Sequence, residues 1–159
     1  MLLLDVIEHF ISPEDFLDEL RTKLPQGEVI ISTGNVAFLV TRLMLMIGQF
    51  NYGRRGILDL THTRLFTFSS LSRLLEQSGF VIMEKHAMPA PFPLALGNGG
   101  WSRFLLQLNS LLIKLSPSLF GYQVVVRAIA LPTVKSLLDL AGQTSERKVR
   151  LMLEEPVSR

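Results

Sequence analysis

The residues best suited to chemistry gather around the end of the first apolar segment, Leu2–Ile7. Asp5, Glu8 and His9 lie there, and His62 lies in a later polar stretch that contains glycines. Carboxylates and neutral imidazoles are ligands that several first-row divalent ions accept, so these four side chains are candidate metal ligands. His9 is also a candidate general base, because an imidazole titrates near neutral pH. The alternative is that these side chains serve polar packing or face solvent at the end of a strand.

The stretch 51–67 that carries His62 is long, polar and irregular. Loops of this length inside a compact domain are more often functional than idle. The stretch also holds three arginines that could bind an anionic acceptor through bidentate hydrogen bonds, namely Arg54, Arg55 and Arg64. The alternative is a solvated loop edge without such a role.

Four apolar segments of strand length must position these residues. They are Leu2–Ile7, Glu28–Thr33, Val81–His86 and Tyr122–Leu131. Helical spacing and end signals predict helices between and after them, over residues 13–24, 36–48, 69–78, 101–115 and 133–141. Strands that alternate with helices predict an α/β fold with right-handed crossovers and an at least partly parallel sheet.

The chain divides into two expected regions. Residues 1–131 form one domain, in which 89–120 is an inserted loop and helix. Residues 132–159 form a C-terminal helix and, from Thr144 onward, a loose polar end.

Three segments carry a resemblance to a known family. LDVIEHF at residues 4–10 resembles the segment around the fourth strand of class I S-adenosylmethionine-dependent methyltransferases. Residues 13–33 are similar to the helix and fifth strand that follow, and residues 58–80 to the stretch running into the next helix. The resemblance covers roughly residues 2–86, and the final strand fits by order only.

The resemblance implies a particular sheet and a particular cofactor. The family's strands run in the order 3-2-1-4-5-7-6, so this chain would supply a partial Rossmann-like sheet equivalent to 4-5-7-6, with the last strand antiparallel and helices flanking it. The implied activity is methyl transfer from S-adenosylmethionine to a small-molecule acceptor. The glycine-rich half that holds the cofactor would be missing, so the chain would be a C-terminal fragment whose own activity is open.

The resemblance also assigns roles to residues. Asp5 would line the cofactor pocket, and Glu8 and His9 would edge the substrate site. Together with the residue types, this leads us to expect that His9 is catalytic and that Glu8, His62 and Arg64 contact the acceptor. Two subfamilies, the ubiquinone-biosynthesis O-methyltransferases and the small-RNA 2′-O-methyltransferases, are similar in having an acidic residue, two further residues and Glu-His after the fourth strand. This similarity implies a divalent metal at Asp5, Glu8, His9 and His62, although the first position is one methylene shorter here than in those subfamilies.

The amino-acid composition limits which cellular compartment and which binding partners we expect. The chain has no cysteine, which excludes disulfides and thiol catalysis and fits a cytoplasmic protein. The net charge of +2 is too small to favour a nucleic-acid partner. We therefore expect a small-molecule acceptor, with a metal-assisted RNA 2′-O-methyltransferase as one alternative.

A second alternative is a non-catalytic module that binds a partner chain or a membrane. No apolar run reaches the length of a membrane span. Val36–Phe50 and Trp101–Leu115 nevertheless are almost wholly apolar and could lie on a membrane surface or against a partner. The first strand would be an exposed sheet edge, where a partner chain or the missing half could pair.

Overall fold

The computed structural model describes residues 1–154, and the side chains of these except residues 95, 96, 135, 139, 140 and 148–154. Its four strands form one sheet in the order β1-β2-β4-β3. The bounds are β1 (Leu2–Leu4), β2 (Glu28–Gly34), β3 (Phe80–Met88) and β4 (Gln123–Ala130). β1 and β2 are parallel, and β4 runs antiparallel to both β2 and β3. The order and the directions confirm the partial Rossmann-like sheet that the resemblance to class I methyltransferases implies.

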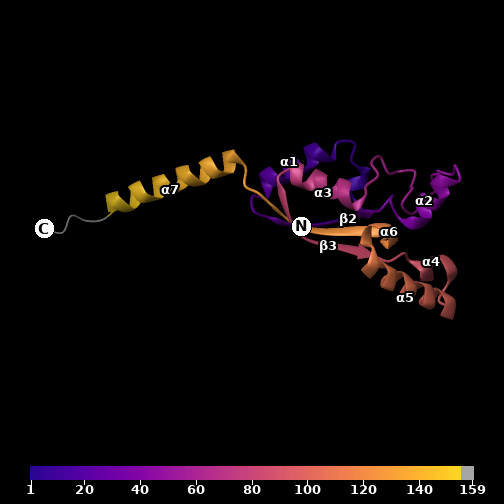
Figure 1. Cartoon of the computed structure of the whole chain (residues 1–159). Helices are drawn as coiled ribbons and strands as arrows, with labels where there is room; N and C mark the ends of the chain where they lie inside the picture. Colours follow the sequence, from indigo (N-terminus) through magenta and orange to yellow (C-terminus); the bar gives the residue numbers. More distant parts are fainter. Residues whose placement is uncertain (155–159) are drawn as a thin grey trace.

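One face of the sheet is covered by two helices, α1 (Pro13–Lys23) and α3 (Phe68–Gln77), which Figure 1 shows together on that side. Alternate strand residues point to this face and are fully buried, among them Val29, Ile31, Val124 and Val126. Leu17, Leu71 and Leu75 meet them from the helices. The helix α3 begins at a capping box, in which Thr67 accepts from the backbone N–H of Ser70 and the Ser70 hydroxyl accepts in return.

The opposite face of the sheet stays largely open. Leu2 and Leu4 are 64% and 54% exposed, and Val81 is 45% exposed. Arg127 crosses this face and donates to the carboxylates of Glu28 and Glu84. β1 lies at the end of the sheet, so its outer edge has no partner strand among the described residues. The sequence predicted this exposed edge.

The strands β2 and β3 run toward a further group of helices (Figure 1). These are α2 (Leu39–Met46), α4 (Phe92–Leu96), α5 (Gly100–Leu115) and α6 (Pro117–Phe120). A second, smaller apolar cluster built around Phe38, Ile57 and Ala90 joins them to the sheet. None of the described helices combines the length and the apolar character needed to cross a membrane.

The sequence-based prediction of the first strand was too long. β1 ends at Leu4, Asp5 adopts a left-handed conformation with φ of 52°, and residues Ile7–His9 form a 3-10 turn, η1. Aspartate tolerates this conformation better than most residues. The turn sends Ile7 into the core, where it is fully buried, so its apolar character reflects packing of a turn and not a strand.

The predicted loose end from Thr144 was also wrong for the described residues. The helix α7 (Val134–Glu154) continues through this stretch and extends away from the sheet (Figure 1). Residues 143–154 are rich in Glu, Arg, Lys, Leu and Met, which have high helix propensity, so the isolated Gly142 does not end the helix. The part of that prediction that concerns residues 155–159 lies outside the described residues.

Candidate functional site

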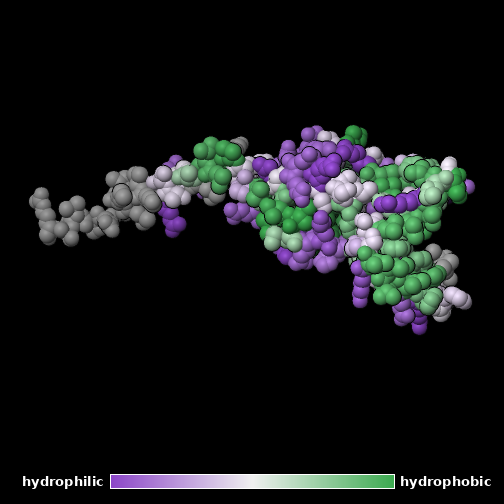
Figure 2. Space-filling view, in the orientation of Figure 1, coloured by the Kyte–Doolittle hydropathy of each residue, from purple (hydrophilic) through white to green (hydrophobic). Residues whose placement is uncertain are grey.

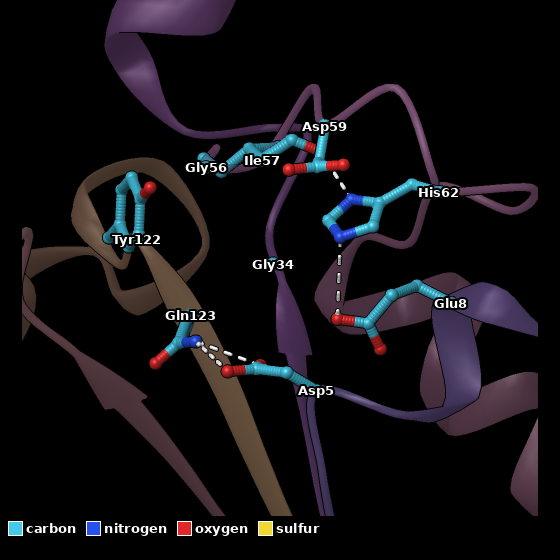
Figure 3. A pocket seen from close by; sticks show the side chains of 9 residues that line it. All are labelled: Asp5, Glu8, Gly34, Gly56, Ile57, Asp59, His62, Tyr122 and Gln123. Atoms are coloured by element: carbon cyan, nitrogen blue, oxygen red, sulfur yellow. Dashed lines mark hydrogen bonds and ion pairs between the residues drawn. The ribbon is translucent and has the colours of Figure 1, made fainter. Parts of the chain in front are cut away.

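A polar cavity of about 230 Å³ opens at the carboxyl ends of the parallel strands β1 and β2. This is the place where ligands bind in open α/β sheets. Four segments far apart in the sequence supply its lining, which Figure 3 shows: Asp5, Glu8, Gly34, Gly56, Ile57, Asp59, His62, Tyr122 and Gln123.

Three of the predicted residues come together at one side of this cavity. Glu8, His9 and His62 each offer a ligand atom, and these atoms lie within 4.8 Å of one another. The Oε1 atom of Glu8 is 3.9 Å from Nε2 of His62, and the two imidazole rings lie edge to face with centroids 5.0 Å apart. Glu8 is only 2% exposed, and its Oε2 atom is buried without a hydrogen-bond partner.

Backbone carbonyls fix the orientation of both imidazoles. Nδ1 of His62 lies 2.9 Å from the carbonyl oxygen of Ile57, and Nδ1 of His9 lies 3.1 Å from that of Thr61. A carbonyl oxygen can only accept, so each Nδ1 carries the proton, and in the neutral ring Nε2 keeps its lone pair. Metal-binding histidines are held in this way by a hydrogen bond from the other ring nitrogen.

The loop that carries His62 is fastened to the turn that carries Glu8. The backbone N–H groups of Thr63 and Arg64 both donate to the carbonyl oxygen of Glu8, at 2.9 and 3.0 Å. The Thr63 hydroxyl can donate to the same oxygen at 3.1 Å or to that of Phe10 at 2.8 Å. These bonds explain how residues 8 and 62 come to share one site.

The burial of Glu8 perturbs its titration. Loss of water around the buried side chain raises the pKa of the Glu8 carboxyl, and the nearby Asp5 charge adds to the rise. Hydrogen bonding from its own backbone and from Thr33 acts in the opposite direction, as does His62. A cation bound between Glu8 and the two histidines would favour the carboxylate form instead.

Asp5 lies in the same cavity but is engaged elsewhere. Its two carboxylate oxygens accept from Nε2 of Gln123 at 2.9 and 3.0 Å, and the Ser32 hydroxyl donates to Oδ1 at 3.3 Å. The structure thus divides the four predicted metal ligands into a cluster of three and a separate carboxylate. Figure 3 shows Asp5 beside Gln123 and apart from Glu8 and His62. The cofactor contact predicted for Asp5 stays a prediction.

Arg64 is not brought to the cavity. Its guanidinium forms a bidentate pair with the carboxylate of Glu14 on α1, at 2.9 and 3.3 Å. The two side chains line a different hollow, beside α3. Arg54 and Arg55 are exposed. The acceptor contact expected of Arg64 therefore gains no support from its position.

Several residues that line the polar cavity were not among the predicted site residues. Gln123 begins β4 and pairs in register with Gly34, so only the antiparallel register brings it to the cavity. The turn at Asp59 could have been predicted from the sequence, because an Asp two residues before a Thr favours a side-chain turn. Its carboxylate accepts from the backbone N–H and the hydroxyl of Thr61 at 2.8 and 2.7 Å.

Comparisons with known proteins find likeness in fold and none in sequence. No family model matches the sequence, and no curated protein matches it significantly. A solved structure described as a SAM-dependent methyltransferase from Archaeoglobus fulgidus is similar, with a TM-score of 0.49 and 17% sequence identity. The similarity covers 80% of this chain and 57% of that chain, so this chain spans little more than half the length of that methyltransferase.

Proposed function

We propose that this chain forms the acceptor side of an S-adenosylmethionine-dependent methyltransferase that acts on a small molecule. One observation carries the proposal: an antiparallel strand, β4, is inserted between β2 and β3, and a polar cavity opens where β1 and β2 end. This strand order is the one that the resemblance to class I methyltransferases implies. A ligand site at the strand ends is the rule for open α/β sheets.

The residues of this chain do not fit the whole methyl donor. The cavity of about 230 Å³ is smaller than the roughly 300–1,000 Å³ of ordinary small-molecule sites. In the described residues neither β1 nor β2 leads into a glycine-rich turn, because the run that holds Gly97, Gly99 and Gly100 lies between α4 and α5. When bound, S-adenosylmethionine supplies an electrophilic methyl group. We place most of its binding surface on a further polypeptide segment that pairs with the free edge of β1.

The chain's own residues position the acceptor and accept its proton. Alignment of acceptor and methyl group is the main source of rate in such a transfer. His62 in the cavity wall and His9 beside it are the candidate bases, because in each neutral ring the Nε2 atom has a lone pair that can take the proton of an acceptor hydroxyl. Acceptor contacts by Glu8 and His62 belong to this proposal.

The same cluster also fits a divalent cation. One carboxylate oxygen is buried without a partner, and two imidazoles whose Nδ1 atoms face carbonyl oxygens can offer Nε2 as a ligand atom, a donor set that suits first-row divalent ions. Glu8, His9 and His62 would hold the ion, and a bound ion would lower the pKa of an acceptor hydroxyl.

Cobalt(II) titration tests the cation site. The full chain should give a saturable visible absorption band with a stoichiometry of one. Replacing His62 by alanine should lower the affinity by more than the roughly 10–100-fold that loss of an outer hydrogen bond costs. His86→Ala is the matched control, because His86 is an exposed imidazole on β3 whose side chain pairs with Glu84 and lies outside the metal-ligand cluster that the described residues form. Equal binding by both variants would exclude the cluster as the metal site.

Calorimetric titration with S-adenosylhomocysteine tests the account of the donor. The chain alone should bind weakly or without measurable heat. Tight binding by the isolated chain would contradict the view that a further segment holds the donor.

A further inference from the structure

The helix α5 buries polar side chains and exposes a row of large apolar ones. Ser102 is 1% exposed and Asn109 is 6% exposed. Asn109 accepts from the backbone N–H of Ala90 at 2.9 Å and donates to the carbonyl oxygen of Phe120 at 2.9 Å. The exposed apolar side chains are Trp101, Phe104, Leu108, Leu111 and Leu115, and they lie beside exposed polar ones, namely Arg103, Gln107, Ser110 and Lys114. The outer face of α5 is therefore more apolar than the solvent-facing side of an ordinary surface helix.

The helix α2 repeats the pattern next to α5. Its buried residue is Thr41, while Val40, Leu43, Leu45 and Met46 are at least half exposed, and Ile47 beyond its end is 72% exposed. An apolar groove of about 150 Å³ connects the two helices, lined by Leu39 and Val40 of α2 and by Leu105, Leu108 and Leu112 of α5, among others. We call the exposed apolar side chains of α2, Ile47, Leu94 and α5 the apolar platform. Figure 2 shows the hydrophobic colouring concentrated over these helices.

The two segments that carry the apolar platform have charges of one sign, and the nearest acidic residue in the sequence, Asp59, bridges to Gly53. Segments 36–58 and 87–126 contain Arg42, Arg54, Arg55, Arg103 and Lys114, and none of the chain's 14 acidic residues. All five cationic residues are exposed, and none forms an ion pair in the described part of the chain. An apolar surface with aromatic side chains and a cationic rim is complementary to anionic lipid headgroups above acyl chains.

We infer that the apolar platform docks this protein on an anionic lipid surface, with α2 and α5 lying in the plane of the interface. A second copy of the chain fits the surface less well. Trp101, Phe104, Leu108, Leu111 and Leu115 do follow a coiled-coil spacing, but over only about two heptads, fewer than a stable seam needs. A second copy would also oppose one cationic rim to another.

The only tryptophan of the chain reports directly on the proposed contact. Trp101 is 78% exposed at the start of α5. Vesicles of phosphatidylcholine with phosphatidylserine should shift its emission to shorter wavelength, and brominated acyl chains should quench it. Vesicles of phosphatidylcholine alone should bind much more weakly, and salt should weaken binding to the anionic vesicles. Each arginine-to-glutamine change in the rim should weaken binding about fivefold at low salt.

A pair of exposed apolar residues provides the matched control. Leu111→Gln, on the apolar platform, should weaken vesicle binding about tenfold, because an apolar side chain no longer leaves water. Ile11→Gln removes an apolar side chain that is 85% exposed and lies elsewhere, so it should leave binding unchanged. The wild-type comparison of the two lipid compositions needs no variant and does not depend on the methyltransferase proposal.

Two results would overturn the inference. One is an emission of Trp101 that no vesicle changes. The other is a dimer in light scattering that Leu111→Gln dissociates while the wild type ignores anionic vesicles, which would make the apolar platform a protein interface. Equal, salt-independent binding to neutral and anionic vesicles would refute the role of the cationic rim.

Discussion

Replacing Glu8 by glutamine should stabilise the metal-free protein at neutral pH. The wild-type side chain is 2% exposed, and its Oε2 atom has no hydrogen-bond partner. A buried neutral polar atom without a partner costs about 1–3 kcal/mol, and a charged one costs more. Glutamine also places a polar atom at this position, so the gain comes only from removing the buried charge. The histidine at 3.9 Å offsets part of this cost. We therefore expect Glu8→Gln to raise the free energy of unfolding by about 2 kcal/mol, or Tm by about 6 °C for a chain of this size.

The gain should depend on pH, because burial raises the pKa of the Glu8 carboxyl above its usual 4.5. Below pH 4.5 the carboxyl is protonated in both the folded and the unfolded chain, so the wild type carries no charge penalty. Between 4.5 and the raised pKa the folded chain keeps a proton that the unfolded chain has lost, so the free energy of unfolding falls as pH rises. Above the raised pKa the full penalty remains. The advantage of the glutamine variant should therefore be large at pH 7 and nearly absent at pH 4.

Urea denaturation in the presence of EDTA measures this difference at both pH values. A divalent ion should reverse the order of the two proteins at pH 7. At a free metal concentration about 100-fold above Kd, the wild type should gain about 2.7 kcal/mol, while the variant, which lacks the anionic ligand, should gain little. A glutamine variant that is less stable than the wild type at pH 7 in EDTA would refute the reasoning. It would mean that the carboxylate is ionised and already compensated.

Three further changes test how the site is held, each by urea denaturation at pH 7. Asn35→Ala should lower the free energy of unfolding by about 3 kcal/mol, because the buried carboxamide donates to the carbonyls of Ser118 and Gly121 at 2.9 and 2.8 Å and accepts a third hydrogen bond. A loss below about 1 kcal/mol would show that water replaces these partners. Gly79→Ala should lower the free energy of unfolding by at least about 1 kcal/mol, since φ is 78° and the new Cβ would collide with the guanidinium of Arg21. An unchanged midpoint of urea denaturation would contradict this. Leu75→Ala should cost about 2–5 kcal/mol, because the side chain is fully buried under the sheet, and a smaller loss would mean that the core closes around the gap.

The strands themselves could be predicted because the relevant signals are local. Each strand is an apolar run, and the alternation with helices limits the possible connections. The order of the strands within the sheet came from the resemblance to class I methyltransferases. The length of β1 could not be predicted in this way. Ile7 is as apolar as a strand residue, but the left-handed backbone at Asp5 diverts it into a turn that packs on the core. Periodicity does not distinguish these two ways of burying one side chain.

The candidate site was predictable in its members but not in its contacts. Glu8 and His9 follow a strand, and His62 lies in a long polar loop, so a shared site was a reasonable expectation. Their actual approach depends on two backbone N–H groups that donate to the carbonyl of Glu8, and backbone bonds of this kind leave no trace in side-chain patterns. Arg64 illustrates the converse, because Glu14 at the start of α1 takes its guanidinium away from the cavity.

The open face of the sheet and the apolar platform both expose apolar side chains. They differ in charge, and the charge indicates which kind of partner each surface suits. On the open face of the sheet, Arg127 lies between Glu28 and Glu84 at 3.4 and 2.7 Å, so the charges are mixed and already paired. Such a face, next to a free strand edge, suits a polypeptide that adds strands and covers the sheet. The apolar platform has unpaired charges of one sign, which suits an anionic lipid surface. Because the two surfaces lie on different elements, a change such as Leu4→Gln should weaken the first kind of binding and leave vesicle binding intact.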